Sequence, residues 1–182
     1  MNFLFPKFSL KQFWVMLGLA CLGAGISGVY GMIHDQITYT ISPEYFTKFK
    51  FHQFYYTDHG WPTRVRVLVI GFLATWWVGF IAGWFLARIA VPKMSTQGAL
   101  QKVMTGFQWI VGSVVVFGIG AGVLGYFSLQ GQGLQSWQNW QESLDLTDLR
   151  SFAIVGYIHD GGYGGALIGL IVAAILLKRK IR

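Results

Sequence analysis

The chain has 182 residues, of which 54% are hydrophobic and only 12% are charged, and its formal net charge is +7. Because soluble domains carry about 25% charged residues, this composition excludes an ordinary soluble protein. The apolar residues fall in long blocks, which is typical of a membrane protein, and the single cysteine, Cys21, excludes an intrachain disulfide. We therefore expect one all-α integral membrane domain over residues 1–182.

Four apolar runs are each long enough to cross the hydrocarbon core, which takes about 20 residues of helix. We predict that they form the spans of a four-helix bundle, at about 12–33, 65–91, 103–127 and 154–177. Gly161, Gly165 and Gly169 recur every four residues in the last span. Small residues at this spacing let helix backbones approach closely in lipid, so we expect this stripe to pack against another span.

The first and third connections, 34–64 and 128–153, are long and rich in aromatic residues. Ser42 is positioned as an N-cap, and Pro43 stands at the first position of the helix that would follow it. In the third connection one helical face gathers the apolar side chains of Leu134, Trp137, Trp140 and Leu144. We predict that each of these connections carries a short amphipathic helix at the membrane interface.

Basic and acidic residues are separated along the chain. Nine lysines and arginines, and no acidic residue, flank the chain ends and the short second connection: Lys7, Lys11, Arg88, Lys93, Lys102, Lys178, Arg179, Lys180 and Arg182. All seven acidic residues belong to the opposite side. By the positive-inside rule we expect both termini to be cytoplasmic and the two long connections to lie outside. The excess of basic residues then reflects the orientation of the chain in the membrane and its contact with an anionic lipid bilayer. We therefore expect no nucleic-acid partner.

The tripeptide Ile-His-Asp occurs twice, each time at the edge of an apolar run, and it contributes the pairs His34-Asp35 and His159-Asp160. One of these spans runs outward and the other runs inward, so both pairs fall near the outer edge of the bilayer. At a rise of about 1.5 Å per residue from the basic ends, their depths differ by about 6 Å. The histidine and aspartate side chains of both pairs are therefore expected on the same side of the membrane.

Two tyrosines and a glutamate accompany these pairs. Tyr30 lies four residues before His34 and Tyr163 lies four residues after His159, so each tyrosine shares a helix face with its histidine. Each aspartate lies about 100° around the helix from the neighbouring histidine, which favours a hydrogen bond to the imidazole of the other pair. Glu44, at the second residue of the predicted short helix, is either a favourable charge at a helix N-terminus or a carboxylate ligand or general base.

Three interpretations of this cluster stay open. In the first, histidines, aspartates and tyrosines form a hydrogen-bonded clasp that ties the first and last spans together. In the second, they bind divalent zinc, iron or manganese through His34, His159 and one or two of Glu44, Asp35 and Asp160. In the third, His34 and His159 hold a haem, which the neighbouring aspartates and tyrosines disfavour. An ion pathway is also disfavoured, because the second and third spans have almost no polar residues at mid-depth.

The segments "HDQITYTISPEYFTKFKF" and "HDGGYGG" give the chain a family resemblance. It resembles a family of bacterial integral membrane proteins without an assigned function, which show a HDxxxYxxSPEYF segment after the first span and a H[ND]xxYxGG segment in the last. The matching residues are His34, Asp35, Tyr39, Ser42, Pro43, Glu44, Tyr45, Phe46, His159, Asp160, Tyr163 and Gly165. The resemblance implies a bacterial inner membrane location, an outer-face cluster as the functional end, and Tyr39 beside Tyr30 and Tyr163 around it. It implies no activity.

The leading hypothesis is a divalent-metal site at the periplasmic face, with metal ligands drawn from His34, Asp35, Glu44, His159 and Asp160. The alternative is a non-enzymatic subunit or scaffold, in a homo-oligomer or a larger membrane complex, whose His-Asp pairs form a clasp. The sequence has no Gly-x-Ser-x-Gly motif, no P-loop and no dinucleotide-binding glycine motif. No residue is therefore assigned a catalytic role, and whether the site is catalytic stays open.

Overall fold

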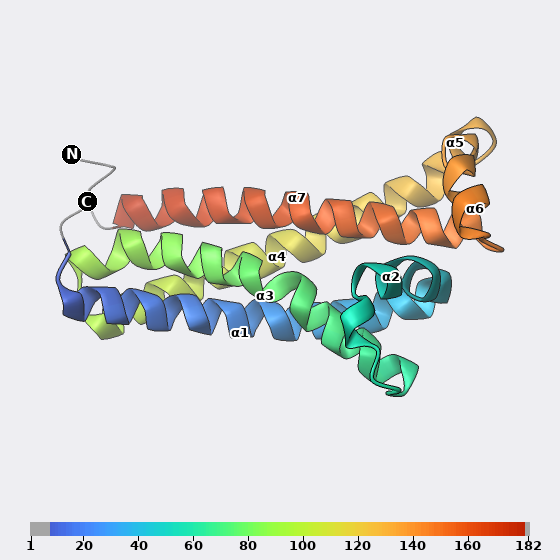
Figure 1. Ribbon diagram of the computed structural model, residues 1–182. Helices are drawn as coiled ribbons and strands as arrows, with labels where there is room; N and C mark the ends of the chain where they lie inside the picture. The colour runs from blue at the N-terminus through green and yellow to red at the C-terminus, as the bar shows by residue number, and fades with distance from the viewer. Residues whose placement is uncertain (1–7, 181–182) are drawn as a thin grey trace.

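The computed structural model describes residues 8–180, and within this range the chain is helical, with no strand (Figure 1). The four long helices are α1 (Leu10–Ile41), α3 (Thr63–Ala90), α4 (Thr96–Ser128) and α7 (Leu149–Lys180). Each corresponds to one predicted span and is long and apolar enough to cross a membrane. The predicted all-α, four-helix architecture of a multi-pass membrane protein is confirmed.

The long connections carry short helices at one end of the bundle. The first contains a π-helix, η1 (Tyr45–Lys50), followed by α2 (Phe51–Gln53) and the 3₁₀-helix η2 (Tyr55–Thr57). Ser42 Oγ accepts a hydrogen bond from the backbone N–H of Tyr45 at 3.4 Å, which confirms the predicted N-cap. The third connection contains α5 (Gln132–Gln135) and α6 (Gln138–Leu144), so the single amphipathic helix expected there is divided in two at Trp137. The short second connection contains η3 (Val91–Lys93).

Helix α1 extends well beyond the predicted end of the first span at residue 33. It continues to Ile41, so His34, Asp35 and Tyr39 belong to the last turns of a helix and not to a connection. Polar side chains after an apolar run do not stop a helix. The helix ends at Ser42 because a residue that precedes proline avoids the helical conformation, and Ser42 is extended, with φ −141° and ψ 96°.

The bundle consists of two closely packed pairs, α1 with α3 and α4 with α7, and contacts between the pairs are much sparser. Glycines set the close approach within each pair. A Cβ built on Gly165 would lie 2.7 Å from the carbonyl oxygen of Ser113, and one built on Gly169 would lie 2.8 Å from the Cα of Ile110. The predicted glycine stripe of the last span therefore packs against α4. In the other pair, Gly79 lies directly against the backbone of Gly23.

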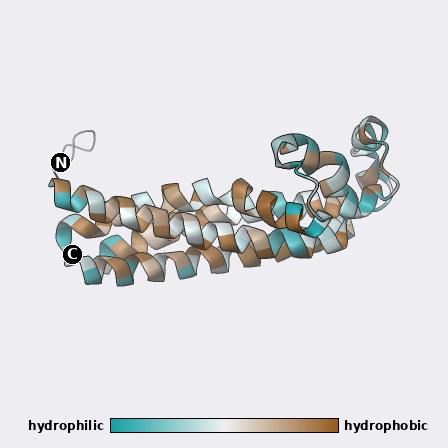
Figure 2. Cartoon of the chain, turned by 60° about the horizontal axis from the view of Figure 1, so that its bottom comes forward, coloured by the Kyte–Doolittle hydropathy of each residue, from teal (hydrophilic) through white to brown (hydrophobic). Residues whose placement is uncertain are grey.

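Two apolar clusters fill the inside of the bundle. One, toward the chain ends, includes Met16, Leu86 and Phe107, and the other, beneath the long connections, includes Phe46 and Phe152. Figure 2 shows the hydrophilic residues concentrated at the two ends, with apolar residues along the helices between them. The described ends of the chain lie together at one end of the bundle (Figure 1). Of the predicted basic cluster there, Lys7 and Arg182 lie outside the described residues.

Substituting Gly165 by alanine is expected to destabilise the α4–α7 pair by about 1–3 kcal/mol, because the new methyl group would overlap the backbone of Ser113. Gly164→Ala is the matched control on the same helix, since a Cβ at Gly164 meets nothing within 4 Å. Thermal unfolding in detergent measures both. Equal midpoints for the two variants would contradict a backbone contact at Gly165.

Candidate metal site

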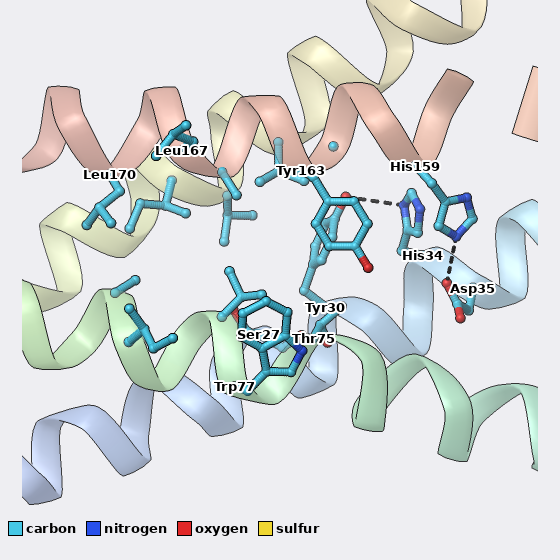
Figure 3. Close-up of a pocket in the computed structure, with 18 of the residues that line it drawn as sticks. Ser27, Tyr30, His34, Asp35, Thr75, Trp77, His159, Tyr163, Leu167 and Leu170 are labelled. Atoms are coloured by element: carbon cyan, nitrogen blue, oxygen red, sulfur yellow. Dashed lines mark hydrogen bonds and ion pairs between the residues drawn. The ribbon is translucent and has the colours of Figure 1, made fainter. Parts of the chain in front are cut away.

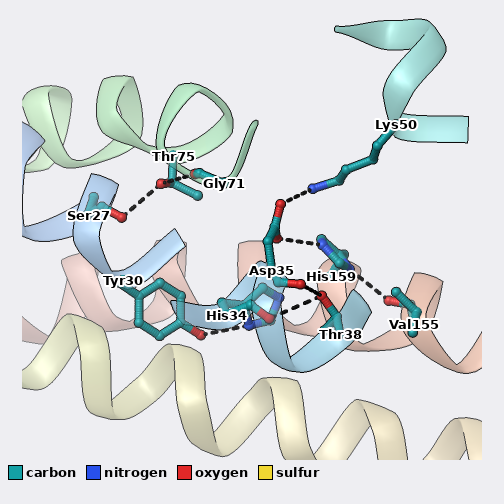
Figure 4. Close-up of polar contacts among 10 residues, drawn as sticks. All are labelled: Ser27, Tyr30, His34, Asp35, Thr38, Lys50, Gly71, Thr75, Val155 and His159. Atoms are coloured by element: carbon teal, nitrogen blue, oxygen red, sulfur yellow. Dashed lines mark hydrogen bonds and ion pairs between the residues drawn. The ribbon is translucent and has the colours of Figure 1, made fainter. Parts of the chain in front are cut away.

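Three polar side chains meet where α1 approaches α7, toward the end of the bundle that carries the long connections (Figure 4). His34 and Asp35 are consecutive residues of α1, and His159 belongs to α7. The rings of His34 and His159 lie edge to face, with their centroids 4.9 Å apart. One candidate ligand atom from each of the three residues lies within 4.8 Å of the other two, so the group could hold a metal ion.

Asp35 is buried, with 2% of its surface exposed. Its Oδ2 accepts a hydrogen bond from Nζ of Lys50 at 3.1 Å, and its Oδ1 lies 3.3 Å from Nε2 of His159. A carboxylate buried without such partners would be very costly. The contact with His159 confirms the expectation that an aspartate of one His-Asp pair faces the imidazole of the other pair.

His159 has its two ring nitrogens in different surroundings. Nδ1 lies 2.9 Å from the carbonyl oxygen of Val155, and because a carbonyl oxygen can only accept, Nδ1 carries a proton and donates it. In a neutral imidazole Nε2 then holds a lone pair, and this lone pair faces the carboxylate of Asp35. Nε2 of His159 and Oδ1 of Asp35 would then be two acceptors that face each other, which is unfavourable unless a proton or another cation lies between them.

His34 is paired with the tyrosine one helical turn before it. The hydroxyl of Tyr30 lies 3.3 Å from Nδ1 of His34, and the two rings stack with centroids 5.5 Å apart. This contact confirms the prediction that the two residues share a helix face. The hydrogen bond engages Nδ1, and Nε2 is the nitrogen of His34 that is left to bind a further group.

Aromatic side chains cover His159 from the side of the first long connection. The ring of Tyr45 stacks on the imidazole with centroids 4.9 Å apart and an interplanar angle of 23°, and it also contacts Phe152. Burial raises the pKa of Tyr45, so its phenol stays protonated and neutral. This cover removes water from around the cluster, which strengthens the electrostatic interactions of Asp35.

Lys50 belongs to the site although the sequence analysis assigns it no role there. Its surface is 5% exposed, and its Nζ lies 5.5 Å from the ring centroid of Phe46. The available signal was its position between Phe49 and Phe51, since a lysine inside an aromatic run must either reach water or find a buried partner. Asp35 is that partner.

Glu44 lies outside the group of three and joins the first long connection to the start of α7. It accepts hydrogen bonds from the backbone N–H groups of Thr147, at 3.1 Å, and Asp148, at 2.8 Å, and forms an ion pair with Lys48. Partial burial opposes its ionisation, but the hydrogen bonds from Asp148, Thr147 and Lys48 outweigh this and lower the pKa of Glu44 from 4.5 to about 2. The structure thus gives Glu44 a helix-capping role.

The other predicted site residues surround the group without joining it. Asp160 is exposed, so the second His-Asp pair contributes only its histidine. Tyr39 packs edge to face on Phe46 at 5.6 Å, in the apolar cluster beneath the connections. Tyr163 is half-exposed and is not bonded to His159, whose nitrogens are engaged elsewhere. The expected symmetry between the two pairs is therefore incomplete.

A cavity of about 300 Å³ opens beside the site, between the two helix pairs (Figure 3). All four long helices contribute to its lining. Tyr30, His34 and Tyr163 lie at the end next to the cluster, and Leu167 and Leu170 lie at the other end. The cluster thus borders an apolar space inside the bundle.

Comparisons with protein-family models, with curated proteins and with solved structures found no match for the chain. The family resemblance suggested by the two His-Asp segments therefore stays a prediction. Function follows from the chemistry of the site itself.

The contacts of Glu44 predict a dependence of stability on pH. A carboxylate whose pKa is lower in the folded state stabilises the fold above its ordinary pKa, here 4.5, and this stabilisation is lost as the pH falls toward about 2. We expect Glu44→Gln to be less stable than the wild type at neutral pH and to lose less stability between these two pH values. Unfolding midpoints in detergent across this range measure the difference, and parallel curves would contradict it.

Breaking the buried ion pair is expected to cost more than removing it. Lys50→Met should destabilise the protein by about 3–5 kcal/mol, because the carboxylate of Asp35 then stays buried without this counter-charge. Asp35→Asn should also destabilise the protein, but by less, because the flexible side chain of Lys50 can turn toward water. The double variant should recover a large part of this loss. Thermal unfolding of the four proteins forms a double-mutant cycle, and strictly additive losses would contradict a direct contact.

Proposed function

We propose that this multi-pass membrane protein binds a divalent metal ion through His34, Asp35 and His159. The observation that carries the proposal is that Nε2 of His159 faces Oδ1 of Asp35 at 3.3 Å while Nδ1 already donates to Val155. With a neutral imidazole both facing atoms hold lone pairs, so a cation is needed next to them. A divalent ion meets this need, and His34 lies near enough to be its third ligand.

Two imidazoles and one carboxylate suit zinc, iron(II) or manganese. Zinc–ligand bonds of about 2.0–2.2 Å hold the ligand atoms of one ion about 3.5 Å apart. The three atoms lie within 4.8 Å of one another, so binding requires the side chains to close by about 1 Å. The Val155 carbonyl and the Tyr30 hydroxyl support this arrangement, since hydrogen bonds to the outer nitrogens commonly orient histidines that bind metals.

Lys50 is the cation that a metal ion would replace. One buried carboxylate cannot neutralise both an ammonium group and a divalent ion, which repel each other strongly where water is excluded. Lys50 is the last residue of η1, next to the outer end of the bundle, and its long flexible side chain can turn toward water. Binding of the ion should therefore release the Lys50 ammonium from Asp35.

The site is proposed to face the periplasm of a bacterium, with both termini in the cytoplasm. The proposal is supported by the described ends of the chain, which lie at one end of the bundle, and by the basic residues Arg88, Lys93 and Lys178 near the ends of α3, η3 and α7. The exposed apolar faces of the long helices suit contact with lipid. Assembly into a homo-oligomer or a larger membrane complex stays a prediction.

A structural clasp is the second candidate, and the Lys50–Asp35 ion pair favours it. Lys50, Asp35 and His159 already join η1, α1 and α7 in one chain of contacts. In a clasp the cation between His159 and Asp35 would be a proton, and no metal would be needed. The two candidates share Asp35 and His159 and differ in the cation between them, and the metal site uses His34 as a ligand where the clasp uses Lys50.

Equilibrium dialysis of chelator-treated protein against Zn²⁺, Mn²⁺ or Fe²⁺, followed by elemental analysis, tests the metal site. We expect one ion per chain in the wild type and a loss of affinity of about 10-fold or more in Asp35→Asn and in His159→Gln. His52→Ala is the matched control, because His52 is an exposed histidine of the same outer connection. Lys50→Met should bind the ion more tightly than the wild type, although it is less stable.

Circular dichroism and gel filtration identify variants that have lost their fold. If the wild type binds no ion stoichiometrically, and the site variants differ only in their unfolding midpoints, the metal proposal is wrong and the clasp stands. Weaker binding in Lys50→Met would also contradict the proposal, because this substitution removes a competing positive charge.

A further inference from the structure

A lipid-facing cavity adjoins the candidate metal site and has chemistry of its own. We propose that this cavity binds an isoprenoid quinone from the bilayer. Its ring would lie at the end lined by Tyr30 and Tyr163, and its tail would leave the bundle between α3 and α7. This binding goes beyond the proposed metal function and does not require it, because neither tyrosine is a ligand of the proposed metal site.

The cavity opens toward the surroundings of the helices between α3 and α7. Trp77 of α3 is 48% exposed, and Tyr163 and Leu167 of α7 are 47% and 62% exposed, although all three line the cavity. Trp77 lies about 20 Å from both ends of α3 at 1.5 Å per residue. The opening therefore lies at the depth of the hydrocarbon core, where the molecules that can enter are lipids.

Polarity changes along the length of the cavity. Tyr30, His34 and Tyr163 are gathered at one end, while Leu167 and Leu170 lie at the opposite end (Figure 3). Ligand sites of this kind are mostly apolar, with a few polar groups that fix the orientation of the ligand. An occupant that matches the gradient has a compact polar head and an apolar tail.

The polar end selects an uncharged head. The charge of Lys50, the one lysine that lines the cavity, is neutralised by Asp35 at 3.1 Å. No unpaired positive charge is left in the lining to hold a phosphate group, which disfavours an anionic phospholipid. The volume of about 300 Å³ also suits one ring and the start of a single tail better than two acyl chains.

The groups available at the polar end are hydrogen-bond donors. The hydroxyl of Tyr163 points into the cavity, and Figure 3 shows no hydrogen bond between it and the other lining residues drawn. The hydroxyl of Tyr30 has His34 as its partner and lies at the same end. A quinone offers carbonyl oxygens to such donors, and its flat ring can stack on the half-exposed indole of Trp77.

A second groove reaches the same residues from the opposite side of the bundle. It has a volume of about 630 Å³, lies between α1 and the α4–α7 pair, and is lined by Tyr30 and His34 among mostly apolar side chains. His34 and Tyr30 are thus accessible from lipid on two sides. A lipid-soluble ligand could enter this end of the cavity or leave it without passing through water.

Binding is tested with a decyl-substituted benzoquinone added to the metal-free protein in phosphatidylcholine nanodiscs, with quenching of tryptophan fluorescence as the signal. We expect saturable quenching with one site per chain. Tyr163→Phe should weaken binding by about 10-fold through the loss of one hydrogen bond, and Trp77→Phe should remove most of the saturable signal.

Ala166→Phe fills the cavity, which Ala166 lines, and should abolish saturable quenching. Ile171→Phe is the matched control, because Ile171 faces outward on the same helix and does not line the cavity. Quenching that rises linearly with quinone, or that is unchanged in Ala166→Phe, would show simple partition into lipid and overturn the proposal. Equal competition by decylbenzene, which has no carbonyl group, would also overturn it, because any alkyl chain would then suffice.

Metal titration of Ala166→Phe separates this site from the metal site. The variant should bind the ion like the wild type, since Ala166 is not among the three proposed ligands. Failure of quinone binding would therefore leave the metal result intact. Failure of metal binding would not affect quinone binding, which is measured in the metal-free protein.

Discussion

The carboxylate of Asp35 is buried in a mostly apolar bundle, and much of the half of the structure that carries the long connections depends on keeping it there. A charge in this position is stable only with close partners, because water is absent and the local dielectric constant is low. Lys50 and His159 supply these partners, and they come from two different elements, η1 and α7. The first long connection must therefore fold back onto α1, which also brings the aromatic side chain of Tyr45 over His159.

The division of the bundle into two pairs explains why a polar cluster and an apolar cavity lie side by side. Within each pair, glycines bring the helix backbones into contact, as at Gly165 in α7. Between the pairs, the described helices have no such contact between backbones, because larger side chains hold them apart. The cavity lies in the space that these side chains leave unfilled. The candidate metal site and the cavity occupy this same interface, so a ligand in one is adjacent to the other.

The sequence predicts the four apolar helices and the glycine stripe, because both depend on short-range spacing along a helix. It also predicts the contact between the two His-Asp pairs, because the two spans run in opposite directions and bring the pairs to similar depths. The end of α1 was misplaced because hydropathy falls at His34, while the backbone stays helical until the residue before Pro43. Lys50 was missed because its burial depends on how η1 winds and folds back. Asp160 was expected to face the imidazole of the other pair, as Asp35 does. It does not, because α7 turns this carboxylate outward while His159 faces α1.

The π-helical winding of η1 places two residues of the site on the same side of the first long connection. In a π-helix each turn bonds residue i to residue i+5, so Tyr45 and Lys50 fall on the same side of the segment. One of them covers His159 and the other reaches Asp35. Ordinary α-helical winding of the same residues would place Tyr45 and Lys50 about 140° apart around the helix and turn Lys50 away from Asp35. The segment can therefore accept changes in its outward side chains more readily than a change from π-helical to α-helical winding.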